Sequence, residues 1–224
     1  MKLPKSWQKL LREHQQQIKI NNIDVSASKK EKPFKRTLAL VFKIPLKTSK
    51  DIRKSLGEKI PINVKEAIFF PPLEGYHFSI QWTWEDNIHN LDLEKFKKEL
   101  RKVFKETQEI KGSLWFPFFG KAGHFGIFLT DSEKEVFGIR QRLDQLFRSF
   151  NLPVGVKSIY YDLTYASLTR YRQRFLPEQI VALNKIKPQK IANITLLKVF
   201  LVLNDRFMTL KNTKFLATFK LGFK

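Results

Sequence analysis

Two short stretches of alternating polar and apolar residues constrain this chain more than any other feature of its sequence. The first runs from Gly75 to Trp82 and reads GYHFSIQW. In a β-strand, side chains alternate between two faces, so His77, Ser79 and Gln81 share one face and the apolar residues share the other. We therefore expect a sheet with one face in the core and a polar face that carries His77.

A second stretch repeats this pattern in the other half of the chain. It runs from Thr164 to Tyr171 and reads TYASLTRY. As a strand it places Tyr165, Ser167 and Thr169 on one face, opposite Ala166 and Leu168. The sequence thus predicts one strand with a hydroxyl-bearing polar face in each half.

The rest of the chain indicates a mixed α+β fold. Apolar periodicity predicts helices at 5–20, 48–59, 92–107, 132–150 and 177–185, and strands at 36–44, 113–119, 124–130, 191–203 and 213–222, the last two joined like a hairpin. Thr48 or Ser49 is expected to cap the second helix, and Ser132 with Glu135 forms a capping-box pattern. No Gly-x-Gly-x-x-Gly or Walker-type loop is present, so antiparallel sheets fit better than a nucleotide-binding doubly wound fold.

Composition limits the possible chemistry and location. The chain has no cysteine, which excludes disulfides, thiolate metal sites and cysteine nucleophiles. No apolar run reaches the 18 or so residues of a membrane span, and no secretory signal is apparent, so a cytoplasmic protein without a membrane partner is expected. We expect residues 1–35 to form a basic helix and linker, and residues 36–224 to form the main domain. The basic, amphipathic start could mimic a transit peptide, but helix packing explains it as well.

Positive charge is concentrated at the two ends of the chain. The net charge is +21, and residues 1–36 carry ten Lys or Arg against three acidic residues. Residues 184–224 carry nine against one. Such a surface attracts polyanions, including nucleic acids, although a lysine-rich solvated surface is an equally simple interpretation.

The pair of motifs resembles the 2H phosphoesterases, a superfamily that includes 2′,5′ RNA ligase-like proteins and cyclic nucleotide phosphodiesterases. The similarity extends from about Arg36 to Tyr171, and more loosely through the terminal strands. It implies an α+β fold of two pseudo-symmetric lobes whose antiparallel sheets face a central cleft, with one motif strand from each lobe. The family's second motif histidine is replaced here by Tyr165.

The resemblance also implies roles for the motif residues, without a metal or a cofactor. His77 and Tyr165 take the two catalytic positions, and Ser79 and Ser167 bind the phosphate. The expected partner is RNA or a nucleotide with a 2′,3′-cyclic phosphate or a 2′,5′ linkage. A histidine suits acid and base roles because its ordinary pKa is near 6.5. In the loop after the second motif, Arg172 and Arg174 are candidates for binding a backbone phosphate.

Several alternatives stay open at this point. A phenol with an ordinary pKa near 10 is a poor base at pH 7, so Tyr165 either serves as an acid or donor or leaves a non-catalytic RNA-binding module. His124 is a possible substitute, whereas His14 and His89 are best explained as solvated. Trp84 and Tyr171 are candidate base-stacking platforms, and Arg170 falls on the strand face opposite Ser167. A basic structural protein with an accidental motif would require the two motif strands to lie far apart.

Overall fold

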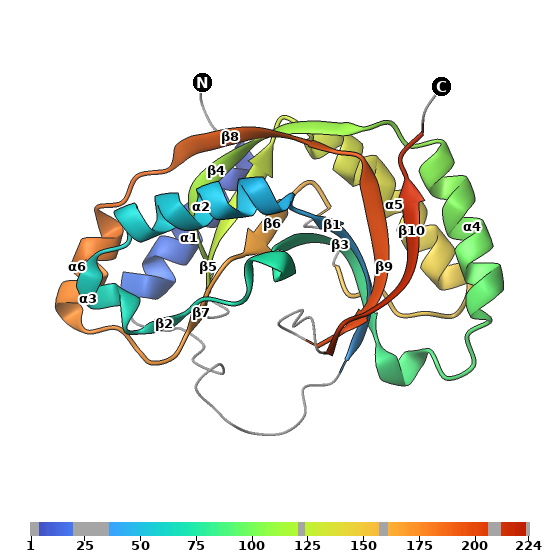
Figure 1. Ribbon diagram of the computed structural model, residues 1–224, viewed down its shortest axis with the longest axis horizontal. Coiled ribbons are helices and arrows are strands. Elements are labelled where there is room, and N and C mark those ends of the chain that lie inside the picture. Colours follow the sequence, from blue (N-terminus) through green and yellow to red (C-terminus); the bar gives the residue numbers. More distant parts are fainter. Residues whose placement is uncertain (1–4, 20–35, 121–123, 157–160, 206–211, 223–224) are drawn as a thin grey trace.

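The computed structural model describes residues 5–19, 36–120, 124–156, 161–205 and 212–222, which form two lobes side by side (Figure 1). Each lobe contains a four-stranded antiparallel sheet. The first sheet has the order β10-β9-β1-β3, with β1 (Thr37–Lys43), β3 (His77–Trp84), β9 (Lys198–Asn204) and β10 (Lys214–Lys220). The second has the order β6-β5-β4-β8, with β4 (Ile110–Gly120), β5 (His124–Thr130), β6 (Thr164–Ser167) and β8 (Gln189–Leu196). The predicted α+β class is confirmed.

The helices interlock the two lobes. α2 (Leu46–Lys59) follows β1 of the first sheet but contacts β8 of the second. Conversely, α5 (Glu133–Ser149) follows β5 of the second sheet but contacts β3 of the first. α4 (Leu93–Lys105) contacts β10, while α1 (Lys5–Lys19) contacts β4 and α6 (Pro177–Asn184) (Figure 1). Because each lobe borrows a helix from the other half of the chain, one continuous apolar core runs through both.

Smaller elements connect these parts. They are α3 (Ile62–Lys65), a two-stranded sheet of β2 (Ile68–Phe69) and β7 (Arg170–Tyr171), and the 3-10 turns η2 (Leu73–Gly75) and η3 (Glu85–Asn87). The sequence pattern predicted none of them as separate elements, because each is too short to show a period. β2 and β7 bring the segment before the first motif next to the end of the second.

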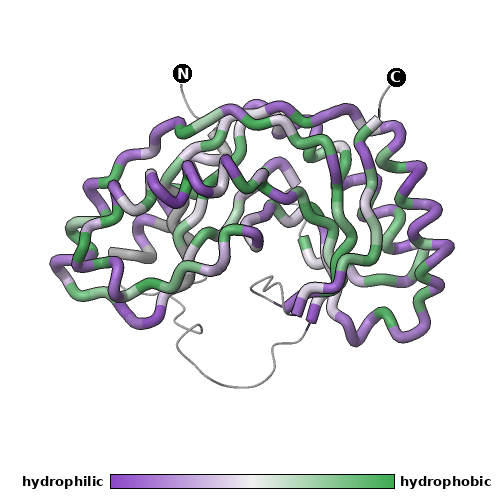
Figure 2. The backbone as a smooth tube through the Cα atoms, viewed as in Figure 1, coloured by the Kyte–Doolittle hydropathy of each residue, from purple (hydrophilic) through white to green (hydrophobic). Residues whose placement is uncertain are grey.

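Hydropathy follows this architecture. The outer helices show hydrophilic turns toward solvent, and the strands are largely hydrophobic (Figure 2). The five central residues of β1 are all buried, which confirms a strand buried on both faces. Within the described ranges, no helix is both long and apolar enough to cross a membrane. The linker expected at 21–35 lies outside the described residues.

The prediction of a single strand at 191–203 is wrong. The chain leaves the second sheet after Leu196, passes through the exposed Leu197 and enters the first sheet as β9. The sequence does not indicate this passage between sheets, because both strands have apolar residues on one face and the apolar run continues from one strand into the next. The hairpin-like pairing of the last two strands is confirmed by the antiparallel register of β9 and β10.

Two predicted helix caps also differ from the structure. α2 begins at Leu46 directly after Pro45, and Ser49 lies buried within it, with its hydroxyl donating to the Ile44 carbonyl at 3.4 Å. Ser132 does precede α5, but its side chain makes no cap hydrogen bond. Its backbone N–H instead donates to the Glu133 carboxylate at 3.1 Å. The capping box is therefore not formed, although the helix starts where it was expected.

Candidate functional site

The two motif strands lie against each other where the lobes meet. β3 and β6 are the edge strands of their sheets, and they are in contact. In β3, Phe78 and Ile80 are buried whereas His77 and Ser79 are only half-buried. This contact rules out the interpretation in which two accidental motifs lie far apart.

β6 shows the same alternation. Thr164 and Ala166 are buried, Ser167 is half-buried, and Tyr165 is 41% exposed. The polar motif residues of both halves therefore lie on the solvent-accessible faces of neighbouring strands. We call these two faces together the site face.

The registers of the two lobes correspond at the motifs. In each lobe the two polar motif residues pair with residues two apart on the adjacent strand. The pairs are His77 with Lys43, Ser79 with Val41, Tyr165 with Phe128, and Ser167 with Gly126. Tyr165 and Ser167 are thus spaced along β6 as His77 and Ser79 are spaced along β3.

The turn before β3 fixes the orientation of the His77 ring. Its Nδ1 lies 2.7 Å from the Gly75 carbonyl oxygen. Because a carbonyl oxygen only accepts hydrogen bonds, Nδ1 carries the proton, and Nε2 is the unprotonated nitrogen of the neutral ring. The turn is held from α2, where the Arg53 guanidinium donates to the Tyr76 hydroxyl at 2.7 Å and to the Pro71 carbonyl. The turn therefore holds the His77 ring with Nδ1 toward the main chain.

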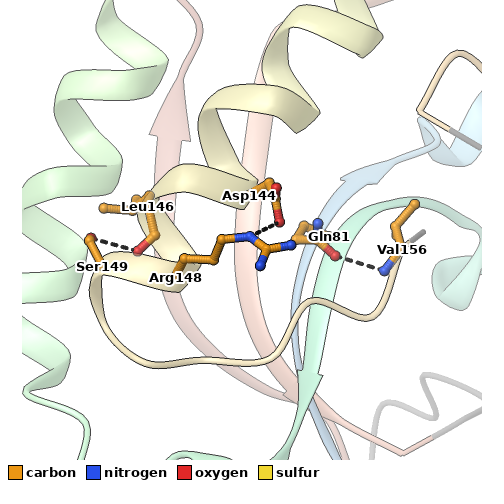
Figure 3. Close-up of polar contacts among 6 residues, drawn as sticks. All are labelled: Gln81, Asp144, Leu146, Arg148, Ser149 and Val156. Carbon is orange, nitrogen blue, oxygen red and sulfur yellow. Dashed lines mark hydrogen bonds and ion pairs between the residues drawn. The ribbon is translucent and has the colours of Figure 1, made fainter. Parts of the chain in front are cut away.

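The predicted face of Gln81 is wrong because β3 contains a β-bulge. Leu40 pairs with Gln81 but Val41 pairs with Ser79, so one step along β1 spans two residues of β3. Beyond the bulge the faces exchange, which buries Gln81 and brings Trp82 onto the site face. The Gln81 Oε1 accepts a hydrogen bond from the Val156 backbone at 2.9 Å, which attaches the loop after α5 to β3 (Figure 3).

Arg140 of α5 joins the two motif strands from the core side. Its guanidinium donates to the carbonyl groups of Ser79 and Ile80 at 3.0 and 2.9 Å, and to those of Tyr161 and Leu163 at 3.0 and 2.8 Å. Burial lowers the pKa of Arg140 to about 10, so the guanidinium stays charged at neutral pH. The nearby Tyr165 is among the groups that partly oppose this lowering of the pKa. A cation is thus fixed between β3 and the segment leading into β6.

The sequence interpretation missed both Arg140 and Lys43. Arg140 lies within the buried stripe of α5, between Val136 and Leu143 at helical spacing, and a charge in such a stripe is a signal for a buried polar contact. Lys43 ends the apolar strand β1 and pairs with His77, which places a cation beside the histidine on the site face. Neither residue belongs to a family motif, so the motifs do not indicate them.

Residues beyond the ends of the motif strands do not behave as predicted. β6 ends at Ser167, and Thr169 is fully buried with its hydroxyl accepting from the Phe125 backbone at 3.0 Å. Tyr171 is also fully buried against Phe125 and Phe175, so it is no stacking platform. Both predictions fail because the chain turns inward after Ser167. Trp84, by contrast, is 45% exposed.

The structure gives the positions of the remaining candidate residues but does not test their roles. Arg172 and Arg174 are exposed in the segment after β7, and the Arg172 guanidinium lies 5.5 Å from the centre of the Phe69 ring. His124 begins β5, two residues before the Gly126 that pairs with Ser167. Phosphate binding by the two arginines and a catalytic role for His124 stay predictions. In the described part of the chain, no group of three or more His, Cys, Asp or Glu side chains is arranged to hold a metal ion.

Comparison with known proteins places this geometry in a structural context. No protein-family model matches the chain, and no curated protein matches it in sequence. Solved structures do match in fold. A phosphoesterase crystal structure superposes with a TM-score of 0.61 at 11% identity, covering 85% of this chain and 100% of its own. LigT of E. coli, complexed with NADP+, gives 0.60 at 12% identity, with 86% and 100% covered.

A third similar structure, TT0787 of Thermus thermophilus, gives a TM-score of 0.58 at 13% identity, covering 84% of this chain and 100% of its own. LigT has also been solved with ATP, with 3′-AMP and with phosphate. The two-lobed α+β fold is therefore that of the LigT-like phosphoesterases. It agrees with the resemblance to the 2H superfamily that the motifs indicate.

Proposed function

We propose that this protein is a metal-independent RNA phosphodiesterase or ligase-like enzyme that acts on 2′,3′-cyclic phosphate ends or 2′,5′ linkages. The observation that carries the proposal is the contact between the two motif strands, which carry His77 and Tyr165 on faces accessible to solvent. The nucleotide ligands of the structurally similar LigT support a phosphorylated nucleoside as the substrate class. A cytoplasmic location would suit such a substrate.

His77 is the acid or base in this proposal. Breaking a phosphodiester by attack of an oxygen nucleophile needs one group to take its proton and another to protonate the leaving oxygen. With the proton of the neutral ring held on Nδ1 by Gly75, Nε2 accepts the proton of the attacking oxygen. In the reverse reaction the same nitrogen returns it to the leaving oxygen.

The hydroxyls and cations of the site face bind the phosphate. Ser79 and Ser167 donate hydrogen bonds to the non-bridging oxygens, where negative charge grows in the transition state. Lys43 stands beside His77 in the register and adds a positive charge. Arg172 and Arg174 hold a neighbouring backbone phosphate.

Tyr165 acts as the second proton-transfer group. A phenol donates a proton or a hydrogen bond to a leaving oxygen at neutral pH, but it takes up protons poorly. Arg140, which is coupled electrostatically to Tyr165, stabilises the negative charge that such donation leaves on the phenol oxygen. The proposed chemistry therefore favours the direction in which Tyr165 is the acid.

Turnover of defined substrates tests the proposal. The protein is incubated, with a chelator present, with a 2′,3′-cyclic nucleotide and with a 2′,5′-linked dinucleotide. We expect product, and we expect His77→Ala to lower the rate by about 10²–10⁴-fold, the usual contribution of a general acid or base. His89→Ala removes an exposed loop histidine and is the matched control. Equal rates for the two variants, or no product from the unmodified protein, would refute the enzyme proposal.

The alternative is a non-catalytic RNA-binding module that keeps this fold. Tyr165 favours it, because the missing imidazole removes one of the two proton-transfer groups. In that case short RNA binds without turnover, binding weakens as salt rises, and His77→Ala leaves the affinity unchanged. The same two proteins, assayed for binding as well as turnover, separate the alternatives.

A further inference from the structure

The two halves of the site face are covered differently. In the second lobe, Trp7 and Leu11 of α1 are buried against Phe128 and Leu163, with 4.5 Å between the ring centres of Trp7 and Phe128. Phe128 is the residue that pairs with Tyr165, so α1 closes the site face directly beside the second motif. A ligand that extends away from the motif residues is therefore excluded from this part of the second lobe.

The first lobe presents aromatic rings on its half of the site face. The sheet register places four of them on the same side as His77 and Ser79: Trp82, Trp84, Phe200 and Phe215. Trp84 and Phe215 are each 45% exposed. The rings form two edge-to-face pairs, Trp82 with Trp84 at 5.1 Å and Phe200 with Phe215 at 5.9 Å. We call these four residues the aromatic face.

The strands that carry the aromatic face bear only positive charge. None of the four strands of this sheet contains an aspartate or a glutamate. The Lys43 ammonium lies 5.1 Å from the centre of the Phe215 ring. Lys198 and Lys220 are directly opposite each other on β9 and β10, although like charges in that position destabilise a sheet. A bound anion would relieve the repulsion between these two lysines.

We propose that the aromatic face binds the bases of a single-stranded RNA whose reacting phosphate lies at His77, with the surrounding lysines against its backbone. Exposed rings stack on bases of any sequence, and ammonium groups neutralise phosphates. This inference rests on the proposed function and narrows its substrate to an oligonucleotide.

The dimensions of the sheet separate an oligonucleotide from a mononucleotide. β10 lies three strands from β3, which at the usual strand spacing is about 14 Å. We therefore expect a base that stacks on Phe215, while the phosphate stays beside Ser79, to belong to a further nucleotide along the RNA. A single nucleoside 3′-phosphate engages the motif residues without needing Phe215.

Binding of two probes tests this inference. The probes are a five-nucleotide single-stranded RNA with a 3′-phosphate and adenosine 3′-monophosphate, each titrated into the full chain by calorimetry. We expect Phe215→Ala and Trp84→Ala each to weaken binding of the pentanucleotide about tenfold, in line with the loss of one stacked base, and to leave the mononucleotide unaffected. Phe215→Trp keeps a stacking surface and should retain the affinity.

Phe137→Ala is the matched control, because it removes a 39% exposed ring from α5, the helix on the other side of the sheet. The inference is overturned if pentanucleotide binding is unchanged in both variants, if the control loses as much affinity, or if the unmodified protein does not bind the pentanucleotide. Pentanucleotide binding that depends on Phe215 without turnover of a cyclic nucleotide would refute the proposed catalysis and leave the aromatic face supported. Turnover of a cyclic nucleotide, with unchanged pentanucleotide affinity in both variants, would refute the role of the aromatic face and leave the proposed catalysis supported.

Discussion

In the proposed mechanism, Tyr165 is the second proton-transfer group. Tyr165→His therefore supplies an imidazole at the position proposed for that group. We expect the rate of cyclic phosphate hydrolysis at pH 7 to rise by about tenfold or more, because an imidazole both accepts and donates protons there. Tyr165→Phe, which keeps the ring but removes the proton, should lower the rate. A rate that does not rise in Tyr165→His would show that this residue does not occupy the second catalytic position.

Arg140 is the residue on which the spacing of the two motif strands depends. Arg140→Met removes the donor of four carbonyl hydrogen bonds, three of them buried, so we expect the free energy of unfolding to fall by about 3 kcal/mol. Urea denaturation measures this. The matched control on the same helix is Arg148→Met, which removes an exposed ion pair with Asp144 and should leave the stability nearly unchanged. Equal denaturation midpoints for the two variants would show that Arg140 does not join the strands.

The polar motif residues could be identified from sequence, and the residues that support them could not. His77 and Ser79 follow from strand alternation alone, because the alternation is intact up to Ile80. Gln81 does not, since the bulge in β3 depends on pairing with β1, a strand some 40 residues away. Lys43 and Arg140 become recognisable only when their neighbours from other parts of the chain are known.

Among the helices and strands, long periodic segments could be predicted from the sequence. The point at which the chain passes from one sheet to the other could not. The predicted strand at 124–130 matches β5, and the helices at 92–107 and 132–150 match α4 and α5 to within two residues at each end. The division of 191–203 into β8 and β9 escaped prediction because it follows from the arrangement of two sheets, which local hydrophobicity does not encode.

α1 is the element whose packing the sequence left most open. The burial of Trp7 against Phe128 predicts that Trp7→Ala lowers the free energy of unfolding by about 3 kcal/mol, the usual cost of removing a buried indole. Lys9→Ala, at an exposed position of the same helix, is the control. The comparison is made by urea denaturation of the full chain. An unchanged midpoint for Trp7→Ala would mean that α1 does not pack on the second sheet.

At the scale of the whole molecule, the chain combines a duplicated architecture with strongly unequal halves. The exchange of α2 and α5 between lobes ties the two sheets into one core, which fixes β3 against β6. The site face then differs on its two sides, with α1 covering the second lobe and aromatic rings lining the first. If RNA binds as proposed, this asymmetry leaves the first lobe as the direction in which it extends from the site.

In the proposed mechanism both motifs bind one phosphate, and a double-mutant cycle measures whether they do. The affinity for adenosine 3′-monophosphate is measured for the unmodified protein, Ser79→Ala, Ser167→Ala and the double variant. Two hydroxyls that bind the same phosphate are energetically coupled, and we predict a coupling free energy of about 1 kcal/mol. Single effects that add to within about 0.3 kcal/mol, or no effect of either substitution, would contradict a shared site.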